Sequence, residues 1–162
     1  MFVLALAAQF PVINPAGTVA DNGAPVQTVD TTFIFAPIPT ICAVDAQQSE
    51  AQLSVAPGQQ VIGAITYICN VPGGFTRRVT SLNGGSLRRG AQGIDYLISQ
   101  TGDAELAFPP TRLDGPLVGD VPAFAALTVG TTGELSVEIP TVAPDLLAGD
   151  YRDTVTFEIT PN

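Results

Sequence analysis

Alternating apolar and polar side chains are the dominant pattern of this chain, and they predict β-strands rather than helices. The alternation is cleanest between positions 151 and 160. The side chains that share its apolar face are Tyr151, Val155, Phe157 and Ile159. We therefore expect a terminal strand here, with one face on a hydrophobic core.

Shorter segments of the same kind recur along the chain, separated by turns rich in proline and glycine. The predicted strands are 41–46, 52–55, 61–70, 75–82, 94–99, 123–129 and 134–139. Gly130–Gly133 is predicted to be the loop of a hairpin, and 101–122 to be mostly loop. About seven short strands with frequent turns are typical of a β-sandwich, so the predicted fold class is all-β.

The segment Thr31–Ile38 differs from the other predicted strands because both of its faces are apolar. One face carries Phe33 and Phe35, and the other carries Thr32, Ile34, Ala36 and Ile38. A strand of this kind needs cover on both sides. Two interpretations stay open: a strand that inserts into a groove, or the first strand of a self-complete sandwich.

The first thirty residues show no clear period and are interpreted as an arm or a residual leader, ahead of a domain at 31–162. The apolar stretch 2–8 has the small-x-small pattern of a signal cleavage site, but no Lys or Arg precedes it. It is too short to cross a bilayer, which takes about 20 apolar residues.

The composition narrows the chemistry available to the chain. It contains no histidine, and its six positive charges are all arginine. Without imidazole or lysine there is no Ser-His-Asp triad, no histidine-ligated zinc and no Schiff-base lysine. We therefore predict a protein that is not an enzyme and has no cofactor or metal. The net charge of −9 argues against a nucleic-acid partner, because such binding relies on basic side chains.

Two arginine doublets, Arg77–Arg78 and Arg88–Arg89, are the only concentrations of positive charge. The simpler interpretation is a solvated hairpin face, and the alternative is a patch for an anionic partner or a neighbouring subunit. Tyr151 and Asp153 also have two interpretations. They suit a ligand-binding pair or, more simply, a core aromatic residue and a carboxylate at a turn or strand edge.

The two cysteines, Cys42 and Cys69, each lie in a predicted strand. In a chain without histidine, two thiols far apart in sequence make a poor redox or metal site. We predict a structural disulfide between them instead. Such a bond indicates an oxidising compartment.

Five motifs share their residues and their order with one known family. They are Gly63–Asn70 (GAITYICN), Gly73–Phe75, Ser81–Leu87 (SLNGGSL), Ile94–Tyr96 and Leu147–Val155 (LAGDYRDTV). With both cysteines, this set resembles the spore coat protein U domain, which is shared with archaic chaperone–usher pilins. The resemblance covers residues 31–162.

The resemblance implies an immunoglobulin-like β-sandwich that lacks its last strand, which a neighbouring subunit supplies from its N-terminal extension. It implies a structural subunit of an extracellular, cell-surface fibre or pilus, built from identical or related pilin subunits by donor-strand exchange. It also implies a periplasmic chaperone and an outer-membrane usher as partners during assembly.

On this interpretation Thr31–Ile38 is the donor strand. Its face with Thr32, Ile34, Ala36 and Ile38 enters the neighbour's groove, and Phe33 with Phe35 gives the alternative register. Pro37 departs from a regular donor strand, because proline removes one backbone donor. The competing hypothesis is a self-complete β-sandwich that acts at the cell surface as an adhesin or ligand-binding module.

Overall fold

The computed structural model describes residues 17–19, 25–27 and 38–162, and the chain divides into two units, Met1–Ile38 and Pro39–Asn162. In the first unit β1 (Gly17–Val19) pairs antiparallel with β2 (Pro25–Gln27). A short hairpin therefore lies within the segment predicted to be an arm. The predicted donor strand lies outside the described residues, except for its last residue, Ile38.

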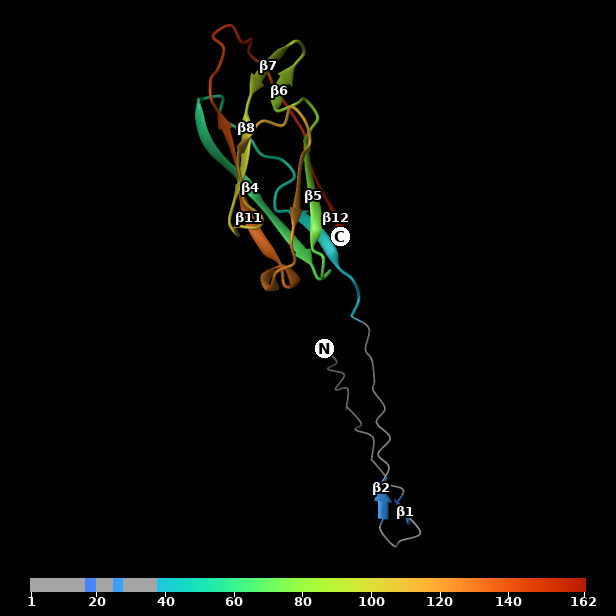
Figure 1. Ribbon diagram of the computed structural model, residues 1–162. Helices are drawn as coiled ribbons and strands as arrows, with labels where there is room; N and C mark the ends of the chain where they lie inside the picture. The colour runs from blue at the N-terminus through green and yellow to red at the C-terminus, as the bar shows by residue number, and fades with distance from the viewer. Residues whose placement is uncertain (1–16, 20–24, 28–37) are drawn as a thin grey trace, which may run out of the picture. The chain divides into compact units, whose positions relative to one another are not determined.

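The second unit contains two antiparallel sheets and a small separate hairpin (Figure 1). The larger sheet consists, in spatial order, of β3 (Cys42–Ala46), β4 (Gly58–Cys69), β11 (Thr131–Ile139), β8 (Leu97–Thr101) and β9 (Phe108–Thr111). The smaller sheet consists of β10 (Leu117–Val121), β5 (Phe75–Ser81) and β12 (Val155–Pro161). The hairpin is formed by β6 (Ser86–Arg89) and β7 (Gln92–Asp95).

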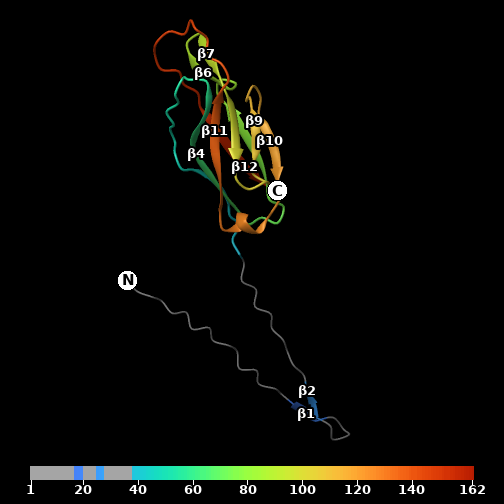
Figure 2. The same cartoon turned by 90° about the vertical axis from the view of Figure 1, so that its left-hand side faces the viewer.

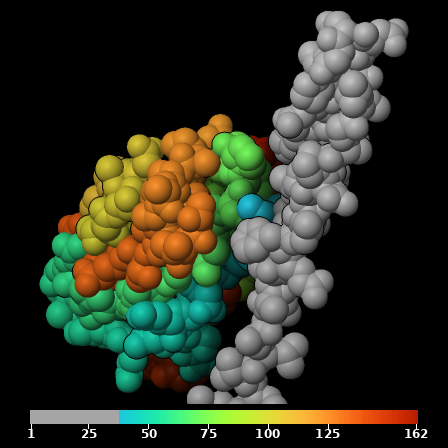
Figure 3. Space-filling model, turned by 90° about the horizontal axis from the view of Figure 1, so that it is seen from below, coloured from blue at the N-terminus to red at the C-terminus, as the bar shows by residue number. Residues whose placement is uncertain are grey.

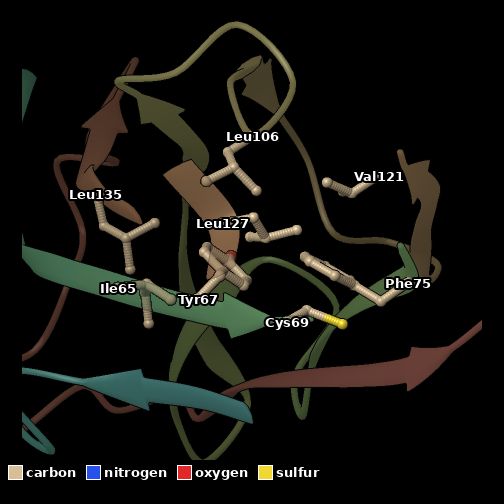
Figure 4. Close-up of a cluster of buried hydrophobic side chains, with 8 residues drawn as sticks. All are labelled: Ile65, Tyr67, Cys69, Phe75, Leu106, Val121, Leu127 and Leu135. Atoms are coloured by element: carbon tan, nitrogen blue, oxygen red, sulfur yellow. The ribbon is translucent and has the colours of Figure 1, made fainter. Parts of the chain in front are cut away.

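The two sheets enclose a hydrophobic core, so the predicted all-β sandwich is confirmed. Period-two alternation points Ile65 and Tyr67 of β4 inward, and likewise Phe75 and Val79 of β5. Figure 4 shows the part of the core in which the Tyr67 and Phe75 rings stack, with their centroids 5.6 Å apart. Burial of apolar side chains of this size contributes roughly 1.5–3 kcal/mol each.

Two predicted strands are wrong. Residues 123–129 contain the 3-10 helix η1 (Ala125–Thr128), in which a helical turn brings both Phe124 and Leu127 against the core. Residues 52–55 are irregular, because the chain leaves the sheet after β3. The predicted hairpin loop is also wrong, since Thr131–Gly133 already belong to β11 and pair with β4.

The segment predicted to be mostly loop contains β9 and β10, which follow each other along one side of the sandwich (Figure 2). Pro109 and Pro110 lie within β9, and an edge strand tolerates them because its outer side has no ladder to break. The predicted strand 94–99 is divided at Tyr96 between β7 and β8.

Arg77 contradicts the interpretation of the first arginine doublet as a solvated face, because its side chain points into the core and is only 6% exposed. Its Nη1 donates a hydrogen bond of 2.5 Å to the carbonyl of Leu106, and its guanidinium lies 4.8 Å from the ring centre of Phe108. The nearby hydroxyl of Tyr67 donates to Gln100. Burial raises the pKa of Tyr67, although the charge of Arg77 opposes the rise. Alternation along β5 places Arg77 between Phe75 and Val79 on the inward face.

The predicted disulfide is confirmed: Cys42 and Cys69 are bonded. They are directly opposite each other at one end of the β3–β4 pair. The bond attaches β3, an edge strand with few residues, to the longest strand of the larger sheet.

Replacing both cysteines with serine is expected to lower the free energy of unfolding by about 3.5 kcal/mol, because the unfolded chain regains the entropy of a large loop. Urea unfolding of the oxidised protein and of the double variant measures the difference. A control double variant, Ser49→Ala with Ser54→Ala, alters two exposed side chains without changing the covalent loop. A cysteine variant as stable as this control contradicts the prediction.

Candidate functional site

The most unusual feature of the sandwich is the outer edge of β12. This strand pairs with β5 on one side and has no hydrogen-bonded strand on the other within the described residues. Its inward-facing side chains, Val155, Phe157 and Ile159, are only half-buried. Val79, which is directly opposite Phe157 on β5, is fully buried. The inward-facing side chains are therefore fully buried at Val79 on β5 but only half-buried on β12.

The opposite side of this gap is formed by β3, the edge strand of the larger sheet. β3 and β12 lie side by side, yet they form no ladder with each other (Figure 1). After Gln47, whose N–H donates to Ala64, the chain leaves β4, so the first half of β4 pairs only with β11. In the described part of the chain, each sheet thus has an unpaired edge that faces the same opening.

The segment that leaves the sheet after Gln47 is attached to β4 by the side chain of Gln60 rather than by a backbone ladder. Gln60 accepts a hydrogen bond from the Ser54 N–H at 2.7 Å and donates one to the Ser54 carbonyl at 2.8 Å. This pair of bonds satisfies the backbone of Ser54 without a neighbouring strand. It fixes one wall of the opening.

An apolar cavity of about 200 Å³ lies between this wall and β12. Its rim includes Leu53 and Phe157, and its floor reaches the core residues Ile65, Ile98 and Val137, which are almost fully buried. At the Val155 end it continues into a wider depression between residues 49–55 and 149–154. We call the cavity and this depression together the groove.

Asp153 is the polar centre of the groove's wider end. Its Oδ2 accepts hydrogen bonds of 2.6 Å from the hydroxyls of both Ser81 and Tyr96. Its Oδ1 accepts from the backbone N–H groups of Asn83 and Thr154. The Asp153 carboxylate thus connects the residues just before β12 to the turn after β5 and to the residue before β8.

Tyr151 has a different role. Its hydroxyl lies 2.8 Å from Oε1 of Gln92 and 2.9 Å from the carbonyl of Leu147. Gln92 also accepts from the N–H of Leu147 and donates to the carbonyl of Asp145. Tyr151 and Asp153 therefore serve two separate networks, and the simpler interpretation describes them better than a ligand-binding pair.

The structure places three of the predicted terminal-strand residues, Val155, Phe157 and Ile159, along β12 at the edge of the gap, while Tyr151 lies ahead of the strand. Sequence reasoning missed the other wall, residues 48–53, and the contribution of Ile62. The available signal was the polar run 47–50, which interrupts the apolar pattern where the chain leaves the sheet.

Other kinds of site find little support in the described residues. They contain no cluster of potential metal ligands. No helix among them is long and apolar enough to span a membrane. In comparisons with known proteins, no family model and no curated protein matches the chain.

Asp153→Ala is expected to lower the free energy of unfolding by about 2–4 kcal/mol, because it leaves two hydroxyls and two N–H groups without their acceptor. Urea unfolding measures the loss. The control is Asp150→Ala, since Asp150 is highly exposed and its ion pair with Arg152 is worth about 0–1 kcal/mol. Equal stabilities of the two variants would falsify this role for Asp153.

Tyr96 predicts a pH dependence. Burial, and then the Asp153 carboxylate, raise the pKa of its phenol above the ordinary value of 10.0. The folded state therefore retains a proton that the unfolded chain loses above about pH 10. This contribution to stability is complete below pH 10 and is lost as the pH rises through the folded-state pKa.

In Tyr96→Phe we expect the free energy of unfolding to fall less steeply above pH 10 than in the native chain. The difference in slope is at most about 1.4 kcal/mol per pH unit. Unfolding by urea at pH 8, 9, 10 and 11 measures it. A residual slope is expected from Tyr67, whose pKa is raised too. Identical slopes in the two proteins contradict the prediction.

Proposed function

We propose that this protein is a structural subunit of an extracellular fibre assembled by strand donation between copies. In this proposal, Thr31–Ile38 of one copy adds a strand to the free edge of β12 in the next. The observation that carries it is the half-exposure of Val155, Phe157 and Ile159 beside the fully buried Val79. A strand laid along this edge gains backbone hydrogen bonds and buries apolar surface at once.

The order of the strands supports the same proposal. The immunoglobulin sandwich has strands ABED in one sheet and CFG in the other. We interpret β3–β4–β11–β8 as ABED, and β5 with β12 as C and F. No described strand occupies the position of G, beside F. Strand donation supplies a strand at this position.

The sequence supports Thr31–Ile38 as the donor. Either of its two apolar faces can enter the groove, which gives the two registers named above. It also comes directly before the first strand of the sandwich, so a short connection joins a donated strand to its own domain.

The resemblance to the spore coat protein U domain and to archaic chaperone–usher pilins supports the assembly route. An assembly route through the periplasm is consistent with the disulfide, because a disulfide requires an oxidising compartment. The partners in this proposal are further copies or related pilins, a periplasmic chaperone and an outer-membrane usher. The exposed edge of β12 gives a physical reason for a chaperone, because an unpaired apolar edge aggregates.

The proposal predicts filaments by electron microscopy and oligomers that survive SDS but dissociate on boiling. Deleting Met1–Ile38 is expected to abolish both and to leave a chain that aggregates. If the shortened chain is monomeric and as stable as the full chain, strand donation is wrong. Clear binding of the monomer on a glycan array then favours the adhesin instead.

Single substitutions in the full chain test which face of the donor enters the groove. Ile34→Asp places a charge on the face assigned to the groove, and we expect loss of the SDS-resistant oligomers, because burying an unpaired carboxylate costs several kcal/mol. Phe35→Asp is the matched variant on the opposite face. Loss with Phe35→Asp alone indicates the alternative register, and retention with both variants contradicts donation by this segment.

A further inference from the structure

The end of the sandwich at which Pro39 joins it has an uncharged surface. We call it the entry pole and define it as residues 39–41, 70–74 and 122–130. The three segments meet on one face, which Figure 3 shows in cyan, green and orange. They contain no Asp, Glu or Arg, and Ile41 and Val129 are 49% and 83% exposed. An exposed apolar surface of this kind marks a contact site.

The chain is held firmly where it enters this pole. The Asn70 side chain accepts a hydrogen bond from the Ile41 N–H and donates one to the Pro39 carbonyl, both 2.8 Å long. The Asn70 N–H donates to the Ile41 carbonyl at 2.9 Å. These three bonds fix the backbone of residues 39–41 to Asn70, within the entry pole.

The proposed strand donation, on which this inference rests, determines what the entry pole faces. Every strand pair in the described residues is antiparallel. Antiparallel pairs also outnumber parallel pairs in sheets generally. A donor antiparallel to β12 ends, at Ile38, beside Val155. Ile38 and Cys42 are four residues apart, which allows about 14 Å at most. The entry pole of the donor must therefore lie against the Val155 end of the acceptor.

That end of the molecule has a different surface, which we call the mouth pole: residues 49–55, 87–89 and 147–152. Arg88 pairs through its backbone with Arg152, and Arg89 lies against Gly149. Both side chains of the doublet are exposed, and no described carboxylate lies within 4.0 Å of either. Val55 and Leu147 are exposed here too.

The charges of the two poles suit each other. The mouth pole carries three arginines, Arg88, Arg89 and Arg152, against two carboxylates, Glu50 and Asp150, so it is slightly positive in a chain of net charge −9. Beside the apolar surface of the entry pole lies the β8–β9 turn with Asp103 and Glu105. The acidic rim of one pole is therefore complementary in charge to Arg88 and Arg89 of the other, which form no ion pair within the described part of the chain.

The geometry points to a second interface between successive copies, in which the entry pole of one docks on the mouth pole of the next. The donated strand holds the two copies together, and the docked poles fix the angle between them. Arg88 and Arg89 face the carboxylates of Asp103 and Glu105, and Val129 lies in the apolar centre.

The first test places a charge in the apolar centre of the full chain. Val129→Asp is expected to keep the SDS-resistant oligomers but to lose the uniform axial repeat of the filaments in electron micrographs. The control, Val118→Asp, alters an exposed valine on β10, away from both poles, and retains the repeat. Thermal unfolding of both variants shows that the sandwich is intact.

The second test exchanges charges. Arg88→Glu with Arg89→Glu is expected to disorder the repeat, and adding Asp103→Arg with Glu105→Arg to restore it, because the ion pairs re-form with opposite signs. Val118→Asp is again the control, because it adds a negative charge on the flank of the sandwich, away from both poles.

The outcomes separate the two proposals. SDS-resistant oligomers whose repeat is unchanged by Val129→Asp and by the arginine exchange overturn the second interface alone. Absence of such oligomers from the native chain overturns strand donation and the second interface with it.

Discussion

Among the residues that the structure describes, β12 has a hydrogen-bonded neighbour on one side only, and much of the rest of the structure follows from that. The chain itself crosses from one sheet to the other between β9 and β10, whereas β3 and β12 lie side by side without pairing. Each half-buried side chain on β12 leaves roughly 1 kcal/mol of hydrophobic stabilisation unrealised. The edge has little of the usual protection: β12 carries one charged side chain, Glu158, and its proline is confined to its last residue. An additional strand is therefore the simplest way to complete the core.

Polar side chains hold the backbone around the opening in place of the missing ladder. Gln60 holds Ser54, Gln92 and Tyr151 hold Leu147, and Asp153 holds the turn after β5. These bonds fix both walls of the groove without filling it, so a strand can enter with little rearrangement. Preorganisation of this kind lowers the entropic cost of binding. Leu147, Tyr151 and Asp153 lie in the motif Leu147–Val155, which gives that motif a physical role.

Alternation could be read from the sequence wherever one face of a strand meets the core, as in β4, β5, β11 and β12. It failed where another constraint prevailed. Phe124 and Leu127 fit a strand by composition, yet a helical turn buries both, and Pro109 and Pro110 obscured an edge strand. Arg77 could not be placed inside from its charge, because its hydrogen bond to Leu106 and its contact with Phe108 come from distant segments. The groove combines β12, which was predicted, with a wall that has no periodic signal.

The net charge of −9 opposes close contact between copies of this chain. Surfaces that touch at the junction of two copies lie within a Debye length, about 8 Å at physiological salt, so acidic surfaces there repel each other strongly. An entry pole without charge and a mouth pole with unpaired arginines reduce this repulsion at the junction only. The remaining carboxylates stay on the flanks of the sandwich, where their repulsion keeps neighbouring fibres apart and soluble. Charge and apolar surface thus have separate places in the proposed fibre: apolar contacts along its axis and carboxylates around it.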